Sequence, residues 1–356
     1  MGGHFEVPEK TLGTKEPCAT AHGSHPPTAC REDPTPRLAE SSCGPRLAGQ
    51  PQLGDFGLPQ MRYAQMRLPT ARYPRQVLIV SIGDLLLDIT IVSEGPLQPD
   101  DDAPATITLG GGGQAANFCA WTASLGDGAR LITRVGDDET GRRLVSDLEA
   151  RGVEVHAVWA PEPTGAIAVL MGLDGNRAMA THRGASVGLR SGDLEDGWFR
   201  DARLLHVPAY SLFVEPIASA ARAAIRLVRE ARGMVAVDLS SAAGLRAYGP
   251  ARMAYVLARL KPEVLFATEA EAATLAVPLE SLAQVPVLKL GSAGCRVFGR
   301  IIPAPTVQPI DPTGAGDAFA AAFCSAWLRG ATPHESAEQA VSAASRSVLV
   351  AGARPS

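Results

Sequence analysis

Short apolar runs that alternate with stretches of helical length constrain the fold of this chain more than any other feature. Runs of this length are typical of buried strands, and they occupy Gln76–Gly83, Leu131–Val135, Leu204–Val207, Met234–Val237, Val264–Ala267 and Val285–Leu290. The clearest helical stretches between them are Ala115–Leu125, Thr140–Arg151, Pro216–Ala231 and Ala251–Leu260. The alternation predicts βαβ units and an α/β fold with a mostly parallel sheet that is covered on both faces.

Two segments break this alternation. Thr106–Leu109 follows an acidic loop, and Gly165–Thr181 has the pattern of a hairpin that turns at Asp174-Gly-Asn. Strands without a following helix predict a small accessory sheet, with strands around residues 89–109 and 164–182. We expect this sheet to cover the carboxyl edge of the large sheet as a lid.

Residues 1–74 differ in composition from the rest of the chain. They are dense in Pro, Gly, Ser, Thr and charged residues, and no helical or strand period holds. Such a segment buries too little apolar surface to offset its ordering entropy, which predicts disorder. The alternatives are a regulatory tail and an over-long start, with translation beginning near Met61 or Met66. We expect residues 75–356 to form one domain.

Charge and cysteine content narrow the classes of function. The net charge is −4 and the basic residues are scattered, which argues against nucleic acid or an anionic membrane as a partner. No apolar run reaches the roughly 18 residues of a spanning helix, and the polar segment after Met1 lacks the core of a signal peptide. The six cysteines include no Cys-x-x-Cys pair. We therefore expect a reduced, cytoplasmic compartment.

The strongest local motif is Asp311-Pro-Thr-Gly-Ala-Gly-Asp317, directly before an apolar helix. Gly314 and Gly316 allow a tight turn that exposes amide groups at the N-terminus of the helix, which favours a bound anion. A carboxylate at this place would repel a phosphate unless it takes part in a reaction. Asp317 is therefore a candidate general base, with the amide cluster stabilising a phosphoryl group in transfer. The alternative is that Asp317 only caps its helix.

A second glycine-rich junction, Leu109–Asn117, also precedes a helix. Its Gly111-x-Gly113-x-x-Ala116 spacing resembles a dinucleotide fingerprint, although the first strand ends far upstream. The alternative is that Asn117 and the glycine backbone bind a ligand hydroxyl.

A third candidate, Gly83–Asp88, follows the first strand, where ligands collect in open α/β sheets. The carboxylates of Asp84 and Asp88 suit the vicinal hydroxyls of a polyol. The alternative is that both are solvated loop acids.

Taken in their order along the chain, the three elements resemble the ribokinase-like (PfkB) carbohydrate and nucleoside kinase family, and the resemblance covers residues 76–354. Its N-terminal signature is similar to Gly112–Asn117 with Leu125-Gly126 and Val135–Gly141. Its C-terminal signature is similar to Asp311–Phe319, and Arg183-Gly-Ala and Gly291-Ser-Ala-Gly also fit.

The resemblance implies a three-layer α/β/α domain with a small β lid, ATP as phosphoryl donor and Mg²⁺ to bridge its phosphates. It implies that Asp317 is the base and that the backbone of Gly314, Ala315 and Gly316 forms the anion hole. The remaining implied site residues are Asp84, Asp88, Gly112, Gly113 and Asn117 for the substrate, Gly291, Gly294 and Thr313 for the nucleotide, and Asp311 for a candidate K⁺ site.

Three positions depart from the family pattern. Thr268 replaces the amide of the usual Asn-x-x-Glu, while Glu271 remains as a Mg²⁺ anchor through water. Lys289 replaces the usual Thr and either reaches the nucleotide or points outward. Asp238-Leu-Ser stands where Asp-x-Asn is common. These departures concern the nucleotide side and not the reaction type.

Among these predictions, the class of substrate is the one that the sequence constrains least. Arg183 suits an anionic sugar acid or sugar phosphate, or forms a structural salt bridge. Few aromatic residues lie near the substrate loops, which favours a sugar over a nucleoside. Phe118, Tyr210 and Phe213 keep a nucleoside as the alternative, and a non-catalytic sugar sensor is the second alternative. His206 is expected to be a core residue, and an exposed lid edge suggests a homodimer.

Overall fold

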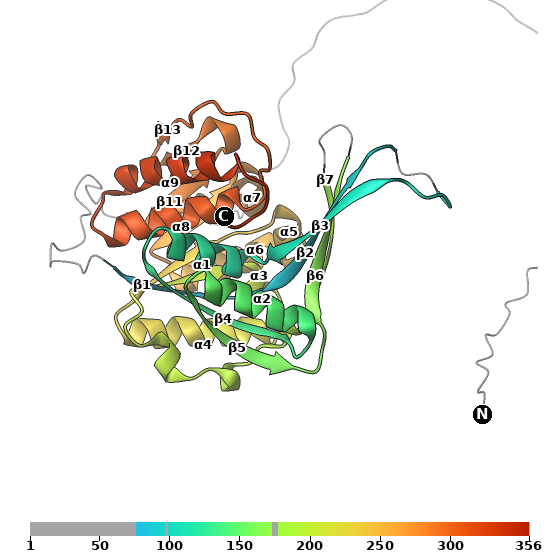
Figure 1. Cartoon of the computed structure of the whole chain (residues 1–356). Helices are drawn as coiled ribbons and strands as arrows, with labels where there is room; N and C mark the ends of the chain where they lie inside the picture. The colour runs from blue at the N-terminus through green and yellow to red at the C-terminus, as the bar shows by residue number, and fades with distance from the viewer. Residues whose placement is uncertain (1–75, 97–98, 173–176, 356) are drawn as a thin grey trace, which may run out of the picture. The chain divides into compact units, whose positions relative to one another are not determined.

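A computed structural model describes residues 76–96, 99–172 and 177–355 of the chain (Figure 1). Residues 1–74 and the expected turn at 174–176 lie outside the described residues, so the expectations for both segments stay predictions. None of the helices in the described ranges has the length and apolar character needed to cross a membrane.

The large sheet positions most of the chain. Its nine described strands run in the order β13-β12-β11-β10-β9-β8-β1-β4-β5. The pairs from β5 to β11 are parallel, and β12 and β13 add an antiparallel edge. The strands are β1 (Leu78–Ile82), β4 (Gly128–Gly136), β5 (Val153–Ala160), β8 (Leu204–Pro208), β9 (Met234–Asp238), β10 (Val264–Thr268), β11 (Val285–Lys289), β12 (Cys295–Val297) and β13 (Arg300–Ile302).

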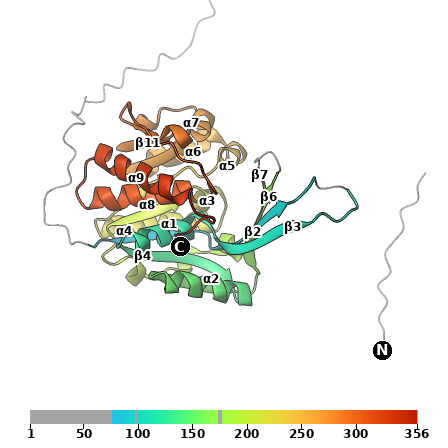
Figure 2. The same ribbon diagram turned by 45° about the horizontal axis from the view of Figure 1, so that its top comes forward.

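Helices cover both faces of this sheet (Figures 1 and 2). Alternate residues of a strand belong to different cores: Val264 and Phe266 pack in one cluster, and Leu265 and Ala267 pack in the other. The first cluster takes residues from α1 (Gln114–Ser124), α2 (Glu139–Ala150), α8 (Ala315–Leu328) and α9 (Pro333–Ser347). The second takes residues from α3 (Tyr210–Phe213), α4 (Ile217–Glu230), α5 (Ala242–Tyr248), α6 (Pro250–Leu260) and α7 (Glu269–Leu275). The expected three-layer α/β/α architecture is confirmed.

A second, smaller sheet extends beyond the helices (Figures 1 and 2). Its order is β3-β2-β6-β7, with β2 (Leu86–Ser93), β3 (Ala105–Gly112), β6 (Thr164–Met171) and β7 (Arg177–Gly184). β2 and β6 are parallel, and the two outer pairs are antiparallel. The chain enters the small sheet directly after β1 and returns to the body where β3 meets α1. The small sheet therefore begins at the carboxyl end of a central strand, where the candidate substrate residues lie.

The expected strands and helices of the large layers are present, and their ends differ from expectation by at most three residues. Three strands were not expected, β5, β12 and β13, and neither were the helices α3, α5, α7 and α9. The alternative that Asp88 is a solvated loop acid is wrong, because Asp88 lies within β2 and Leu86–Ser93 pairs along its whole length with β3.

Candidate active site

The turn before α8 has the geometry of an anion-binding site. Gly314 caps the helix with φ 76°, and a Cβ on it would lie 2.3 Å from the carbonyl oxygen of Ala353, so only glycine fits. In the described part of the chain no acceptor takes the amide of Gly314 or Gly316. Two unsatisfied N–H groups at the start of a fourteen-residue helix fit the phosphates of a nucleotide.

Asp317 lies in the first turn of the same helix and does not cap it. Its amide donates to Gly314 O (3.0 Å), and the cap residue is Gly314, so the alternative role as an N-cap is wrong. Asn117 Nδ2 donates to Asp317 Oδ2 (3.1 Å). Burial raises the pKa of Asp317 to about 7, the Asn117 bond lowers it, and the charge of Asp238 raises it further. A carboxylate with a pKa near neutrality is well matched to general base catalysis.

The side chain of Lys289 points into the protein and lies near the turn before α8. At the end of β11, its Nζ donates to Asp238 Oδ2 (2.7 Å), and a Cβ built on Gly316 would lie 3.6 Å from Nζ. Burial lowers the pKa of Lys289, but the carboxylates of Asp238 and Glu271 outweigh this effect and raise it. The interpretation that Lys289 points outward is wrong, and a fixed positive charge lies beside the amides of the turn.

Thr268 and Glu271 cap α7 reciprocally. Glu271 Oε2 accepts from Thr268 N (2.8 Å), and Thr268 Oγ1 accepts from Glu271 N (3.3 Å). Burial and the nearby Asp238 raise the pKa of Glu271. The described residues contain no cluster of three or more His, Cys, Asp or Glu side chains that could hold a metal ion. Mg²⁺ bound through water and phosphate oxygens needs only one or two carboxylates, so Glu271 and Asp238 fit this donor set.

Gly291 and Gly294 follow β11 in a short turn next to Lys289. Gly294 adopts φ 97°, and a Cβ there would lie 2.0 Å from Ile302 O, so glycine is required. Thr268 and Lys289 are the last residues of the paired parallel strands β10 and β11, and Gly291 and Gly294 come shortly after β11. All four residues therefore lie at the same edge of the sheet, where these strands end.

Asp84 and Arg183 form a bidentate ion pair at the root of the small sheet. Arg183 Nε and Nη2 each donate to one oxygen of Asp84 (both 2.8 Å), and Nη1 donates to Tyr210 O (3.1 Å). Asp84 is 6 % exposed. Both side chains are thus committed to each other, and the structural salt bridge that we considered for Arg183 is confirmed.

Asp88 is the carboxylate that faces the glycine run. Its Oδ1 is buried without a hydrogen-bond partner in the described residues, and burial raises its pKa to about 6. A Cβ on Gly112 would lie 1.9 Å from Asp88 Oδ1, so the carboxylate occupies the space that the glycine leaves. An orphaned buried oxygen of this kind fits a hydroxyl of a bound ligand.

The glycine run does not have the arrangement of a dinucleotide site. Its first three glycines end β3 of the small sheet, and Gly113 (φ 95°) is held against Asp84, since a Cβ would lie 2.3 Å from Asp84 O. A dinucleotide site needs an acid near the end of a strand for the ribose, and Asp137 and Asp138 follow β4 at such a place. Asp138 instead caps α2 and accepts from Gly141 N (2.7 Å) and from Thr164, and Asp137 pairs with Arg142. The geometry therefore gives no support to the dinucleotide alternative, and Gly113 serves to start α1, which carries Asn117.

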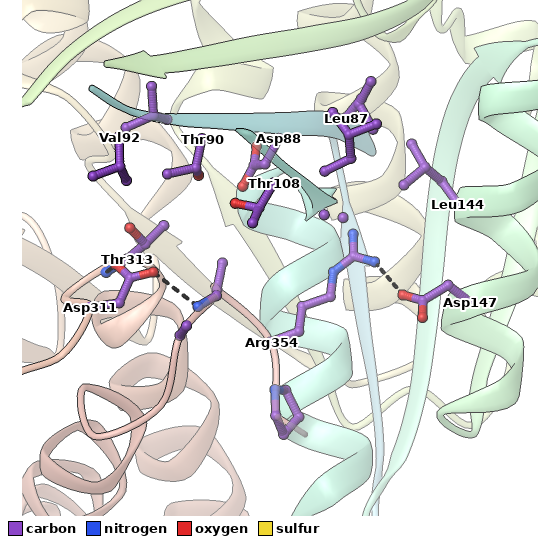
Figure 3. A pocket seen from close by; sticks show the side chains of 18 of the residues that line it. Leu87, Asp88, Thr90, Val92, Thr108, Leu144, Asp147, Asp311, Thr313 and Arg354 are labelled. Atoms are coloured by element: carbon purple, nitrogen blue, oxygen red, sulfur yellow. Dashed lines mark hydrogen bonds and ion pairs between the residues drawn. The ribbon is translucent and has the colours of Figure 1, made fainter. Parts of the chain in front are cut away.

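The segment after α9 also enters the site, and the motifs gave no signal of it. Asp311 accepts from Thr313 N and from Gly352 N (both 2.9 Å), which joins the turn before α8 to this segment. A cavity of about 720 Å³ lies between the small sheet, α2 and this segment, and Asp88, Asp311, Thr313 and Arg354 are among its lining residues (Figure 3). Arg354 is 7 % exposed and is separated from Asn117 by 237 positions.

Comparisons with known proteins agree with this geometry. The family model described as pfkB family carbohydrate kinase matches residues 76–356. Fructokinase-1 of Oryza sativa subsp. japonica is 29 % identical over 270 residues, which cover 70 % of this chain and 82 % of the relative. The ATP-dependent ribose-1-phosphate kinase of Halopiger xanaduensis is 32 % identical over 267 residues, which cover 71 % and 85 %.

The solved structures include proteins whose fold is similar to that of this chain. A protein described as ribokinase II of E. coli, in complex with ATP and Mg²⁺, superposes with a TM-score of 0.67 at 22 % identity, covering 78 % of this chain and 94 % of that one. The fold is thus ribokinase-like. Together with the family match over nearly all of the described residues, these findings show that the chain belongs to the PfkB family of carbohydrate kinases.

Proposed function

We propose that this protein transfers the γ-phosphoryl group of ATP to a hydroxyl of a small sugar or sugar-like substrate. One observation carries the proposal: Asp317, with a pKa raised to about 7, follows directly on two unpaired amides and lies close to a buried lysine. A base, an anion hole and a positive charge are the three groups that in-line phosphoryl transfer requires.

Each group has a defined task. Asp317 accepts the proton of the attacking hydroxyl, while the amides of Gly314 and Gly316 and the ammonium of Lys289 stabilise charge on the phosphoryl oxygens. Glu271 would hold Mg²⁺ through water, and this ion would neutralise charge between the phosphates. Thr313, Gly291 and Gly294 would line the nucleotide, and Asp311 is the candidate residue for a K⁺ site.

On the substrate side, the structure favours recognition of hydroxyl groups over recognition of an anion by Arg183. The orphaned Oδ1 of Asp88 and the amide of Asn117 are suited to a polyol, and Gly112 and Gly113 allow close approach of backbone. Arg183 is neutralised by Asp84. The two curated relatives are named for a neutral sugar and for a sugar phosphate, so both substrate classes belong in a test.

A nucleoside remains the alternative substrate, with Tyr210 and Phe213 as the available rings. These rings are in edge contact with centroids 5.9 Å apart and are partly buried. Phe118 is not available, because it is fully buried and stacks on His206 within the core.

The test is ADP release by the full chain with Mg-ATP against a panel of sugars, sugar acids, sugar phosphates and nucleosides, with and without K⁺. Asp317→Asn should lower turnover by about 10²- to 10⁴-fold, because the base is lost. The Kd for ATP should change less than about twofold, because the amides of the turn remain. Turnover of Asp317→Asn at the wild-type rate would contradict the assignment of the base. Bound ATP without turnover on any substrate would favour a non-catalytic sensor.

A further inference from the structure

Arg354 is a buried charged residue that the proposed chemistry does not yet use. It lies after α9, and its polar partners lie on β3, α1 and α2 (Figure 3). Its guanidinium makes three polar contacts: Nε to Asn117 Oδ1 (3.1 Å), Nη2 to Gly112 O (3.0 Å) and Nη1 to Asp147 Oδ2 (2.9 Å). A side chain so enclosed is positioned by its partners and positions them in return.

The contact with Asn117 determines which end of the amide faces the base. Asn117 donates through Nδ2 to Asp317 Oδ2 (3.1 Å), and its Oδ1 accepts from Arg354. A guanidinium has only donors, so it holds the oxygen end of the amide and excludes the flipped orientation. In the flipped orientation Oδ1 would face the carboxylate of Asp317, and two acceptors would repel each other.

The space for Arg354 comes from the glycine run. A Cβ on Gly111 would lie 2.0 Å from Arg354 Nη1, so a side chain there would exclude the guanidinium. The flanking residues are fixed as well: Trp121 Nε1 donates to Ala353 O (3.0 Å), and Gly352 N donates to Asp311 Oδ2 (2.9 Å). This segment thus joins the substrate loop, α1 and the turn before α8.

We propose that Arg354 is a positioning residue for the phosphoryl transfer, which orients the amide of Asn117 toward Asp317. The proposal rests on the proposed function, because it assigns Asp317 a reaction to serve. Arg354 acts through Asn117 and does not touch the reacting atoms.

The charged groups around Asp317 determine its pKa, which is the quantity that the experiment should measure. Asp238 on β9 and Asp88 on β2 raise the pKa of Asp317, whereas Lys289 on β11 and the Asn117 hydrogen bond lower it. Replacing Arg354 leaves Asp238 and Lys289 in place and releases the amide, and it also removes a charge that lowers the pKa of Asp88. The pKa of Asp317 should then rise, and the acid limb of the pH profile should move to higher pH.

The experiment compares Arg354→Gln, Arg354→Lys and Arg151→Gln in the full chain. Arg151 is the matched control, because it pairs with the same Asp147 carboxylate and contacts Pro355 O but does not reach Asn117. For Arg354→Gln and Arg354→Lys we expect kcat to fall about tenfold or more, as for a lost charged hydrogen bond. We expect the acid limb of kcat/KM to move up by about one pH unit, with KM for ATP unchanged. Arg151→Gln should keep the wild-type limb.

A double-variant cycle tests whether the effect passes through Asn117. In an Asn117→Ala background, Arg354→Gln should cause no further shift of the acid limb. An equal shift with and without Asn117, a wild-type limb in Arg354→Gln, or the same shift in Arg151→Gln would overturn the proposal. So would a wild-type profile in Arg354→Lys, since charge alone would then suffice.

A second readout separates this proposal from the proposed function. The carboxyl ¹³C resonance of Asp317 reports its pKa by NMR without any turnover. If the wild type shows no kinase activity, the proposed function fails, yet the shift of this resonance in Arg354→Gln still tests the link to Arg354. An unshifted resonance would overturn the positioning role.

Discussion

Lys289 and Asp238 illustrate how one residue pair can serve both stability and reaction. The pair is almost fully buried, with side chains 13 % and 1 % exposed, and its positive end lies beside the turn that would hold phosphate. A buried pair contributes little net stability, but removing one partner leaves an uncompensated charge. The retention of this pair at the site is therefore better explained by a role for the ammonium toward phosphate.

Replacing Lys289 by Met should reveal both effects. Lys289→Met should lower the free energy of unfolding by about 3–5 kcal/mol, because Asp238 is left buried and unpaired, and should lower kcat by about 10²-fold. The double variant Lys289→Met/Asp238→Asn should recover most of the stability and none of the activity. Urea denaturation and steady-state kinetics measure the two quantities, and recovery of activity in the double variant would contradict a role for the ammonium.

The ionisation of Asp317 gives a second prediction at this scale. The base must be ionised to act, so kcat/KM should fall about tenfold per pH unit below the pKa near 7. Because the pKa is raised on folding, ionising Asp317 disfavours the folded state, and this cost grows from about pH 4 to about pH 7. Asp317→Asn should therefore raise Tm relative to the wild type, and by more at pH 8 than at pH 5. A Tm difference independent of pH would contradict a raised pKa at this residue.

The motifs identified candidate residues whose chemistry is local in sequence, but they did not identify which distant residues pair with one another. Asp317, Gly314 and Gly316 could be recognised because a tight turn, a helix start and a carboxylate occupy consecutive positions. The pairing of Lys289 with Asp238 and of Arg183 with Asp84 depends on strands that meet only in the fold. Arg354 carried no signal, since nothing near it in sequence suggests a buried partner.

At the scale of elements, two helices that both begin at a glycine bring the site together. α1 starts at Gly113 and α8 at Gly314, and the two helices pack against each other in one core. Their first turns carry Asn117 and Asp317, which are joined by a hydrogen bond. The packing of two apolar helices therefore sets the distance between the substrate loop and the base.

Gly314→Ala should disrupt this junction. Its positive φ costs about 1–2 kcal/mol for a residue with a side chain, and contact with Ala353 O at 2.3 Å adds to that cost. Gly126→Ala is the matched control, because Gly126 has φ 82° but nothing within 4 Å of its Cβ. We expect urea denaturation to show a larger loss of stability for Gly314→Ala, together with loss of activity that Gly126→Ala does not show. Equal losses would show that contact with Ala353 is unimportant.

The elements missed from sequence have weak patterns for identifiable reasons. β5 carries the polar residues Glu154 and His156 among its apolar residues because it is an edge strand of the sheet. α5 and α7 have only seven residues each, which is short for a helical period to show. α9 buries alanines and serines in place of large apolar residues. Long helices and central strands, by contrast, follow directly from the apolar pattern.

At the scale of the whole molecule, the small sheet leaves apolar side chains on its surface. Ile107 and Leu109 of β3 are 60 % and 51 % exposed and pair with Ile91 and Ile89 of β2 on the same face. β3 is also an edge strand, with unpaired backbone groups. We propose that a second copy of this chain covers this face.

Light scattering coupled to size-exclusion chromatography tests the dimer. The variant Ile107→Lys/Leu109→Glu should shift the molar mass from that of a dimer toward that of a monomer, because charged groups would be buried at the interface. Tyr255→Lys is the control, since Tyr255 is equally exposed, at 63 %, but lies on α6. A monomeric wild type, or a dimer that persists in the double variant, would contradict this arrangement.

The ion pair between Asp84 and Arg183 has a mechanical consequence. It clamps the root of the small sheet, because Asp84 lies two residues before the start of β2 and Arg183 lies near the end of β7. Eight-residue strands extend from this root, and at roughly 3.3 Å per residue they form a lever about 26 Å long. A pivot of about 10° at the root would sweep the far end through roughly 4–5 Å without breaking a ladder bond. A small rotation of the small sheet at its root, beside the candidate substrate residues, would therefore cause a large displacement at its far end.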